Sequence, residues 1–222
     1  MHKTFTQSFF ILLLSMGLTR AQAHPTSFQG AWSLVNESSH MGRHTMFTYS
    51  HRYWLASALH YAYFPLEEEG LEYEMAAVGV NTLLKRWNRP TSQGNFYLSL
   101  AQGREFTQGL SGRPVSLVEV DLDWEDRRYY IATGYTRHFR QSFDSDSVGI
   151  SDIEVKKLRM GFAPYLGEFT ELNTWFIMQA MQVNQGSVEL TPLLRFYYRN
   201  ALWEIGSSLK GGGFLFNFML HM

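Results

Sequence analysis

Apolar and polar side chains alternate along most of this chain, and this period of two constrains the fold more than any other feature. In the segment 213–222, Phe214, Phe216 and Phe218 fall on one side of an extended chain, whereas Asn217 and His221 fall on the other. Successive side chains of a β-strand point to opposite faces, so this segment is expected to form a strand. Similar alternation recurs at intervals of about fifteen residues, separated by Gly, Pro, Asn, Asp or clustered charges. The period therefore predicts an all-β protein.

About twelve strands are predicted from these runs, and ten is the alternative count. They cover residues 27–36, 43–51, 53–64, 70–82, 94–104, 115–124, 128–138, 151–163, 171–183, 188–199, 201–208 and 213–222. Several connections at one end of these strands are very short, and those at the other end tend to be longer and more polar, although 83–93 is long where a short turn is expected. Short turns on one rim and longer loops on the other are typical of bacterial outer-membrane barrels.

Two architectures alternate in this way: a water-soluble β-sandwich with its apolar face inward, and a membrane barrel with its apolar face outward. Aromatic residues make up 16% of the chain and fall near the expected strand ends, where membrane-interface girdles are found. Only a closed barrel lets a long, aromatic final strand lie in lipid without an exposed hydrogen-bonding edge. We therefore predict a closed antiparallel transmembrane β-barrel, with Phe214, Phe216 and Phe218 facing lipid.

Residues 1–23 have the layout of a secretory signal peptide. An apolar stretch begins at Phe9, and Ala21-Gln22-Ala23 is a small-residue cleavage site. Cleavage after Ala23 leaves residues 24–222 as a single barrel domain, exported to the outer membrane of a Gram-negative bacterium. Beyond residue 23 no apolar run is long enough for a transmembrane helix. The chain has no Cys and a net charge of −1, so disulfides, a lipid-bearing Cys and a nucleic-acid partner are not expected.

The final strand resembles that of known outer-membrane proteins, whose last strand is read by the barrel-assembly machinery. Those strands typically end in an aromatic residue, whereas this sequence ends in Met222. His-Pro-Thr-Ser-Phe at 24–28, Leu-Leu-Lys-Arg-Trp-Asn at 83–88 and Gly-Phe-Ala-Pro-Tyr-Leu-Gly-Glu-Phe at 161–169 are similar to a family of uncharacterised proteobacterial outer-membrane β-barrel proteins. The resemblance spans most of the chain. It implies contact with outer-membrane lipid and with the assembly machinery, but no activity.

Charged residues are predicted on the inward faces of the strands. The expected lumen charges are Glu72, Glu74, Glu119, Asp121, Asp123, Lys157, Arg159, Arg195 and Arg199. A barrel of about twelve strands encloses only a modest lumen, between the filled eight-stranded case and the open porins. Opposite charges there form either a salt-bridge plug or the lining of a narrow polar channel, and no residue spacing decides between them. A channel or uptake barrel for a small polar or metal solute is the leading functional hypothesis.

Histidine and methionine residues suggest a metal site near one rim. If the turn at Arg52 is tight, His44 faces His60 across two strands, with Met46 on the same inward face and His40 in the adjoining loop. Imidazole and thioether groups are ligands for soft metals. The segment 40–46 is therefore a candidate soft-metal site at the extracellular rim.

A second candidate metal site lies at the periplasmic rim. Closure of the barrel brings His221 close to the mature N-terminus, with His51 in the neighbouring turn, and cleavage after Ala23 makes His24 the first residue. His24 then offers both an α-amine and an imidazole, which resembles the histidine brace of certain copper proteins. Copper is thus the candidate cofactor, although the ring of Pro25 restricts the backbone that follows.

A lipid-modifying barrel enzyme is the third hypothesis, and the sequence favours it least. Ser57 and His60 are three residues apart, so they face opposite sides of a strand and cannot form a dyad. Ser50 can approach His44 or His60 on the inward face, but no activating acid accompanies it. No motif for a nucleophile elbow or a phosphate loop occurs.

Overall fold

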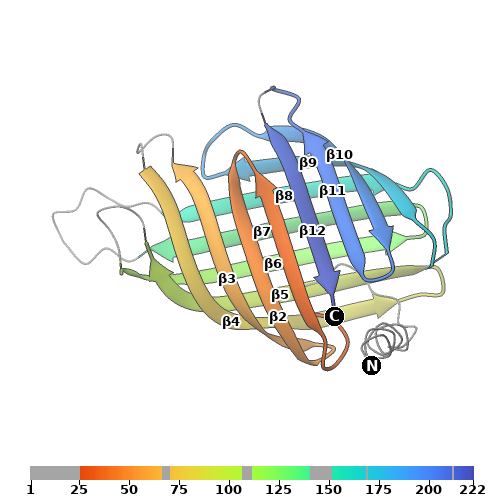
Figure 1. Ribbon diagram of the computed structural model, residues 1–222, viewed down its shortest axis with the longest axis horizontal. Coiled ribbons are helices and arrows are strands. Elements are labelled where there is room, and N and C mark those ends of the chain that lie inside the picture. Colours follow the sequence, from red (N-terminus) through yellow and green to blue (C-terminus); the bar gives the residue numbers. More distant parts are fainter. Residues whose placement is uncertain (1–25, 67–70, 107–111, 141–151, 169, 212) are drawn as a thin grey trace, which may run out of the picture.

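A computed structural model describes residues 26–66, 71–106, 112–140, 152–168, 170–211 and 213–222. In it, twelve antiparallel strands form one closed barrel in which each strand pairs with its sequence neighbours and β1 pairs with β12. Figure 1 shows the strands winding obliquely around the barrel, with β1 and β12 side by side. Among the described residues no helix has the length and apolar composition to span a bilayer. The predicted signal peptide and His24 lie outside the described residues.

The strands are β1 (Trp32–Ser39), β2 (Gly42–Arg52), β3 (Leu55–Leu66), β4 (Leu71–Asn88), β5 (Ser92–Glu105), β6 (Pro114–Asp126), β7 (Tyr129–Arg140), β8 (Ile153–Phe162), β9 (Asn173–Val183), β10 (Glu189–Tyr198), β11 (Ala201–Ser207) and β12 (Phe214–His221). The predicted all-β closed barrel and the count of twelve are confirmed.

Two predicted boundaries were wrong for identifiable reasons. The first strand was expected over 27–36, but β1 begins only at Trp32 and runs to Ser39, because its polar residues continue the ladder with β2 as far as Ser39 and Gly42. The segment 83–93 was expected to be a long connection, but β4 continues through a register shift between Leu83 and Lys85. A β-bulge of this kind inserts an extra residue without ending the strand. Only residues 89–91 separate β4 from β5.

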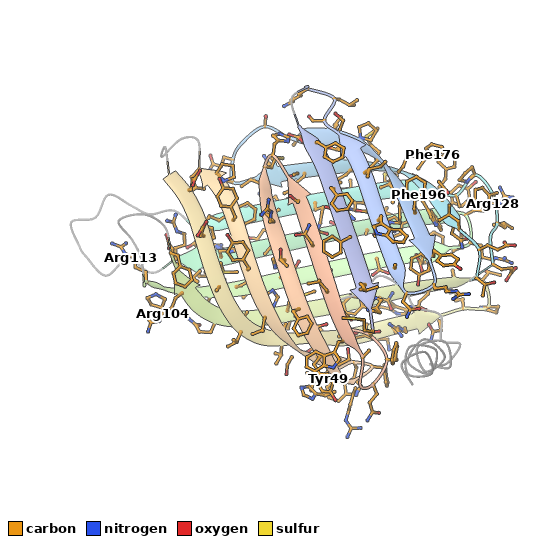
Figure 2. All side chains as sticks on the ribbon, in the orientation of Figure 1. Tyr49, Arg104, Arg113, Arg128, Phe176 and Phe196 are labelled. Carbon is orange, nitrogen blue, oxygen red and sulfur yellow. The ribbon has the colours of Figure 1, made fainter. Side chains whose placement is uncertain are left out.

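The barrel has two distinct rims. We call the rim that carries Met222 and the short turns at 53–54, 127–128 and 199–200 the terminal rim, and the opposite one the distal rim. Figure 2 shows Phe176 and Phe196 toward the terminal rim, whereas Arg104 and Arg113 lie at the distal rim. Exposed aromatic side chains gather around the terminal rim: Trp32, Tyr53, Trp54, Trp87, Trp124, Tyr129, Phe162, Tyr198 and Trp203. This is the girdle predicted from the sequence.

The outer face of the barrel is apolar. Val78 and Phe214 are 62% and 65% exposed, and outward-facing Leu, Ile, Val, Met and Phe residues occur around the barrel. Phe214 and Phe216 are outward, as predicted, whereas Leu215 and Asn217 on the same strand are buried inside. A continuous apolar exterior is unfavourable in water and is what a bilayer solvates.

The polarity of the inner face changes along the barrel axis. Toward the distal rim it forms a packed hydrophobic cluster from β3, β4, β5, β6 and β8: Ala62, Phe64, Leu66, Tyr73, Met75, Ala77, Ala101, Val115, Leu117, Ile153 and Val155. Nearer the middle, the inward positions carry charged and amide side chains. Part of the interior near the distal rim is thus a packed apolar core. The polar part of the interior lies next to this core and closer to the terminal rim.

Candidate functional site: a charged lumen

Two carboxylates and three basic groups form a network inside the barrel. Glu37 lies on β1, Glu204 on β11, Lys157 and Arg159 on β8, and Arg195 on β10. Each faces inward because strand alternation places its outward neighbours, such as Leu158 and Trp203, in the apolar band. The network therefore joins β8 to β1, β10 and β11, three strands with which β8 does not pair.

Glu204 is the centre of one half of this network and is only 1% exposed. Its Oε1 accepts hydrogen bonds from Nε and Nη2 of Arg195, both at 2.7 Å. Its Oε2 accepts from Nδ2 of Asn217 at 2.6 Å and lies 3.2 Å from Nη1 of Arg159. Arg195 also lies over the ring of Tyr130, at 4.5 Å from its centroid. Charge-assisted bonds of this kind satisfy a buried carboxylate.

Lys157 and Glu37 form the other half. Lys157 Nζ donates to Glu37 Oε2 at 2.6 Å, and Arg159 Nη2 lies 3.8 Å from Glu37 Oε1. Strands β9 to β12 separate β8 from β1 along the wall, so neither contact is between neighbouring strands. The Lys157–Glu37 pair thus crosses the interior of the barrel.

Two cavities meet at this pair. The distal cavity offers about 50 Å³ to water-molecule centres, and the cavity toward the terminal rim offers about 140 Å³. A single water needs roughly 10–15 Å³ on this measure, so both cavities have room for several waters. Residues that line both cavities are Glu37, His44, Glu119, Asp121, Gly134, Lys157, Arg159 and Asn217. These charged side chains therefore lie where the two cavities meet, which we call the junction.

The facing wall of the junction is acidic. Glu119, Asp121 and Asp123 point inward from β6, as predicted. Asp123 accepts a hydrogen bond from Asn95 at 2.8 Å. Within the described ranges, neither Glu119 nor Asp121 has a Lys, Arg or His nitrogen at ion-pair distance. The basic groups are thus neutralised by Glu37 and Glu204, whereas these two acids are not.

Three predicted lumen charges lie elsewhere. Glu72 and Glu74 are outward, because they share the parity of outward-facing Val78 on β4, and Tyr63 donates to Glu72 at 3.0 Å. They lie near the distal rim, where the strand leaves the apolar band. Arg199 occupies the β10–β11 turn with a φ of 53° and lies over the ring of Tyr198. These three assignments were wrong.

Several interior charges were missing from the prediction, among them Glu189, which is 8% exposed on β10. Glu37 fell in a segment expected to be a loop, and Glu204 fell in a weakly patterned strand. Arg140 and Glu105 form a fully buried pair, with Nη2 of Arg140 2.7 Å from Oε1 of Glu105. The outward Trp203 and Ile205 on either side of Glu204 are the signal that identifies it as inward.

The structure brings together most of the predicted soft-metal cluster. His44 Nε2 lies 3.1 Å from His60 Nδ1, and Asn81 Nδ2 donates to the sulfur of Met46 at 3.0 Å. The residue directly opposite His60 is Met46, whereas His44 was expected there. The turn lies at 53–54 and not at Arg52, and with the one-residue shift between Ser50 and Arg52 this moves the partner of His60 from His44 to Met46. His40 is not part of the cluster, because its Nε2 lies 2.6 Å from Glu189 Oε2 on β10.

The predicted site at the terminal rim does not assemble from its described members. His51 is on the outer face, where its Nε2 lies 2.7 Å from Ser57 Oγ. His221 is buried inside, with its Nδ1 2.6 Å from Ser33 Oγ. The barrel wall separates the two imidazoles, so they cannot share an ion, and the role of His24 stays a prediction. Among the described residues, no group of three or more His, Asp or Glu side chains is placed to hold a metal.

The serines examined as nucleophiles have other partners. Ser57 and His60 face opposite sides of β3, as expected, because Ser57 is outward with His51 and His60 is 2% exposed on the inner face. Ser50 Oγ accepts from the backbone N–H of Ser27 at 3.0 Å. Inside the described part of the barrel, Ser33 Oγ lies 2.6 Å from His221 Nδ1, a Ser–His contact that the sequence analysis did not single out.

A closed antiparallel barrel with an apolar exterior and a wet, charged interior defines the class of transmembrane β-barrel proteins. No protein-family model matches the sequence, and no curated protein matches it. Among solved structures, the chain is similar to one described as "KdgM porin", with a TM-score of 0.41 and 10% identity over 86% of this chain and 98% of that one. A structure from work titled "Unveiling the Mechanism Behind the in-meso Crystallization of Membrane Proteins" has a TM-score of 0.38 and 9% identity, over 86% of this chain and 83% of that one. These values are too low for either likeness to say what this chain does.

Proposed function

We propose that the protein is an outer-membrane β-barrel of a Gram-negative bacterium whose lumen is a narrow passage for a small polar solute or ion. Its apolar exterior and its girdle of aromatic residues support insertion in lipid. Export by the signal peptide at 1–23 and insertion by the barrel-assembly machinery belong to the same proposal.

The observation that carries the proposal is the pair of wet cavities that meet at shared charged residues. A barrel held shut by a structural network would have no need for polar cavities on both sides of its central ion pair. Buried ion pairs often stabilise a fold no more than packed apolar groups of similar volume do, and sometimes less. A polar passage, by contrast, requires charged side chains along its path.

Conductance in planar lipid bilayers tests the passage directly. The mature chain, refolded in detergent and inserted in the bilayer, is expected to give small, discrete conductance steps. Gly134 lines both cavities, so Gly134→Phe should reduce the conductance. Ile131→Phe is the matched control, because Ile131 is 41% exposed on the outer side of the same strand and lines neither cavity. A barrel that inserts but never conducts would reject the proposal.

A second candidate function, binding of a soft metal ion, is favoured by the His44–His60 contact. The two nitrogens lie 3.1 Å apart, and Met46 is directly across from His60. Metal–nitrogen bonds are about 2.0–2.1 Å long, so an ion held between these atoms requires the rings to separate by roughly 1 Å. Neutral nitrogen and thioether ligands suit a monovalent soft ion such as Cu(I).

Titration of the detergent-solubilised barrel with Cu(I) or Ag(I) tests this second function. Binding tighter than micromolar that is lost in His44→Ala or Met46→Leu, and kept in the outer-face control His51→Ala, is the expected result. Unchanged binding in the first two variants would reject the site. Cu(II) titration of the cleaved chain against His24→Ala tests the predicted copper site at the N-terminus separately.

A further inference from the structure

We propose that Lys157 is a movable gate that exchanges between Glu37, across the lumen, and Asp121, on its own side of the barrel. With Lys157 on Glu37 the two cavities are divided, and with Lys157 on Asp121 they join. The inference rests on the proposed channel function, and it assigns the residue that opens the channel.

A glycine leaves room for the second position of Lys157. Asp121, Gly134 and Lys157 are consecutive register partners across β6, β7 and β8, and all three line both cavities. A Cβ on Gly134 would lie 2.6 Å from Asp121 Oδ1 and 3.8 Å from Lys157 Cε. Both side chains therefore lean over the glycine toward the same point. The Lys157 ammonium is one bond beyond Cε, so rotation of the end of the side chain is enough to bring it toward Asp121.

The distribution of charge makes both positions accessible. In the observed position, Glu37 has two cationic neighbours, Lys157 at 2.6 Å and Arg159 at 3.8 Å. Asp121 has none at ion-pair distance among the described residues, and it lies beside the carboxylate of Glu119. When Lys157 moves, Glu37 keeps Arg159, and Asp121 gains a cation that offsets its repulsion with Glu119. In the first state Asp121 has no cationic partner, and in the second state it gains Lys157 while Glu37 retains Arg159.

Lys157 is suited to this exchange and Arg159 is not. A lysine is a point charge on a flexible four-carbon chain, whereas a guanidinium is held by several directed bonds. Arg159 donates to Gln179 at 2.8 Å and contacts Glu204 and Glu37. Among the residues that the structure describes, the short hydrogen bond of Lys157 is the one to Glu37. The fixed arginine therefore holds Glu37 in place while the lysine moves.

Single-channel recording of two isosteric variants tests the gate. Glu37→Gln removes the closed-state partner, and we expect the ratio of open to closed time to rise about fivefold, the factor that corresponds to about 1 kcal/mol. Asp121→Asn removes the open-state partner, and we expect a fall of similar size. Gly134→Ala fills the space above the glycine without changing charge and should act like Asp121→Asn. If Asp121→Asn and Glu37→Gln change the ratio in the same direction, Lys157 is a fixed obstruction and the gate is refuted.

A structural readout separates failure of the gate from failure of the channel. A crystal structure of Glu37→Gln is expected to show Lys157 Nζ within ion-pair distance of Asp121, and Nζ retained beside residue 37 would overturn the proposal. This result does not depend on conductance. A barrel that is electrically silent, but in which the lysine has moved, rejects the channel and leaves the exchange of partners established. Heat-modified migration in SDS gels checks that each variant is folded.

Discussion

Replacing Glu204 with Gln is the sharpest test of the energetics inside the barrel. The carboxylate is 1% exposed and accepts charge-assisted bonds from Arg195, with further contacts from Arg159 and Asn217. Gln keeps the shape of Glu but loses the charge, so two buried guanidinium groups lose their shared counter-ion. The barrel as a whole should therefore become less stable.

The contacts that remain set the size of this effect. Removing one member of a buried ion pair costs about 3–5 kcal/mol. Arg159 keeps its bond to Gln179 at 2.8 Å and its contact with Glu37, and Arg195 keeps the ring of Tyr130. We therefore expect the lower end of the range, about 3 kcal/mol.

Urea-induced unfolding of the barrel in lipid vesicles, followed by tryptophan fluorescence, measures this cost. Glu119→Gln is the matched control, because Glu119 is also an inward carboxylate but has no ion pair among the residues described. It should change the free energy of unfolding by less than about 1 kcal/mol, because no ion pair is lost with its charge. If Glu204→Gln were no more destabilising than the control, the network would not hold the barrel together as described.

Three further outcomes follow from the same structure. Leu122→Arg places a charge on the outer face and should cost about 2–4 kcal/mol in lipid vesicles, and a cost near zero would contradict a lipid-facing position. Gly79→Ala directs a methyl group against the carbonyl oxygen of Leu100 and should cost about 1–3 kcal/mol in the same unfolding assay, whereas an unchanged midpoint would contradict this close approach. Reversal potentials in a salt gradient should show a preference for cations that disappears when Glu119 and Asp121 are both neutralised, because these acids line both cavities without a basic partner among the described residues, and an anion preference in the unmodified chain would refute this.

The alternation of apolar and polar residues was enough to predict the strands and, for most strands, which residues face inward. Leu122 and Trp124 are outward and Asp121 and Asp123 are inward because side-chain parity survives small errors in strand boundaries. Parity should also have placed Glu72 outward with Val78. The prediction instead placed every charged residue in the lumen. It did not consider that a charged side chain can face outward where its strand extends beyond the apolar band.

Contacts across the lumen could not be derived from the sequence. The Lys157–Glu37 pair joins residues 120 positions apart on strands that are not neighbours. Its geometry depends on the stagger of all the strands between them. The bulges at Ser50/Arg52 and at Leu83/Lys85 alter that stagger, and neither has a Gly or Pro to mark it. Local pattern therefore predicts which residues face inward, but not which of them meet.

The joint between β1 and β12 has a consequence for how the molecule is made. It contains six register pairs, against thirteen between β5 and β6, and it connects the two strands furthest apart along the chain. The entropic cost of bringing distant segments together means that this joint forms last. Until it forms, the incomplete sheet presents two unpaired edges, which a hydrocarbon environment does not tolerate. A barrel that lacks either end strand is therefore not a weaker version of this protein, because without the closing pair the remaining strands have no stable state in the bilayer.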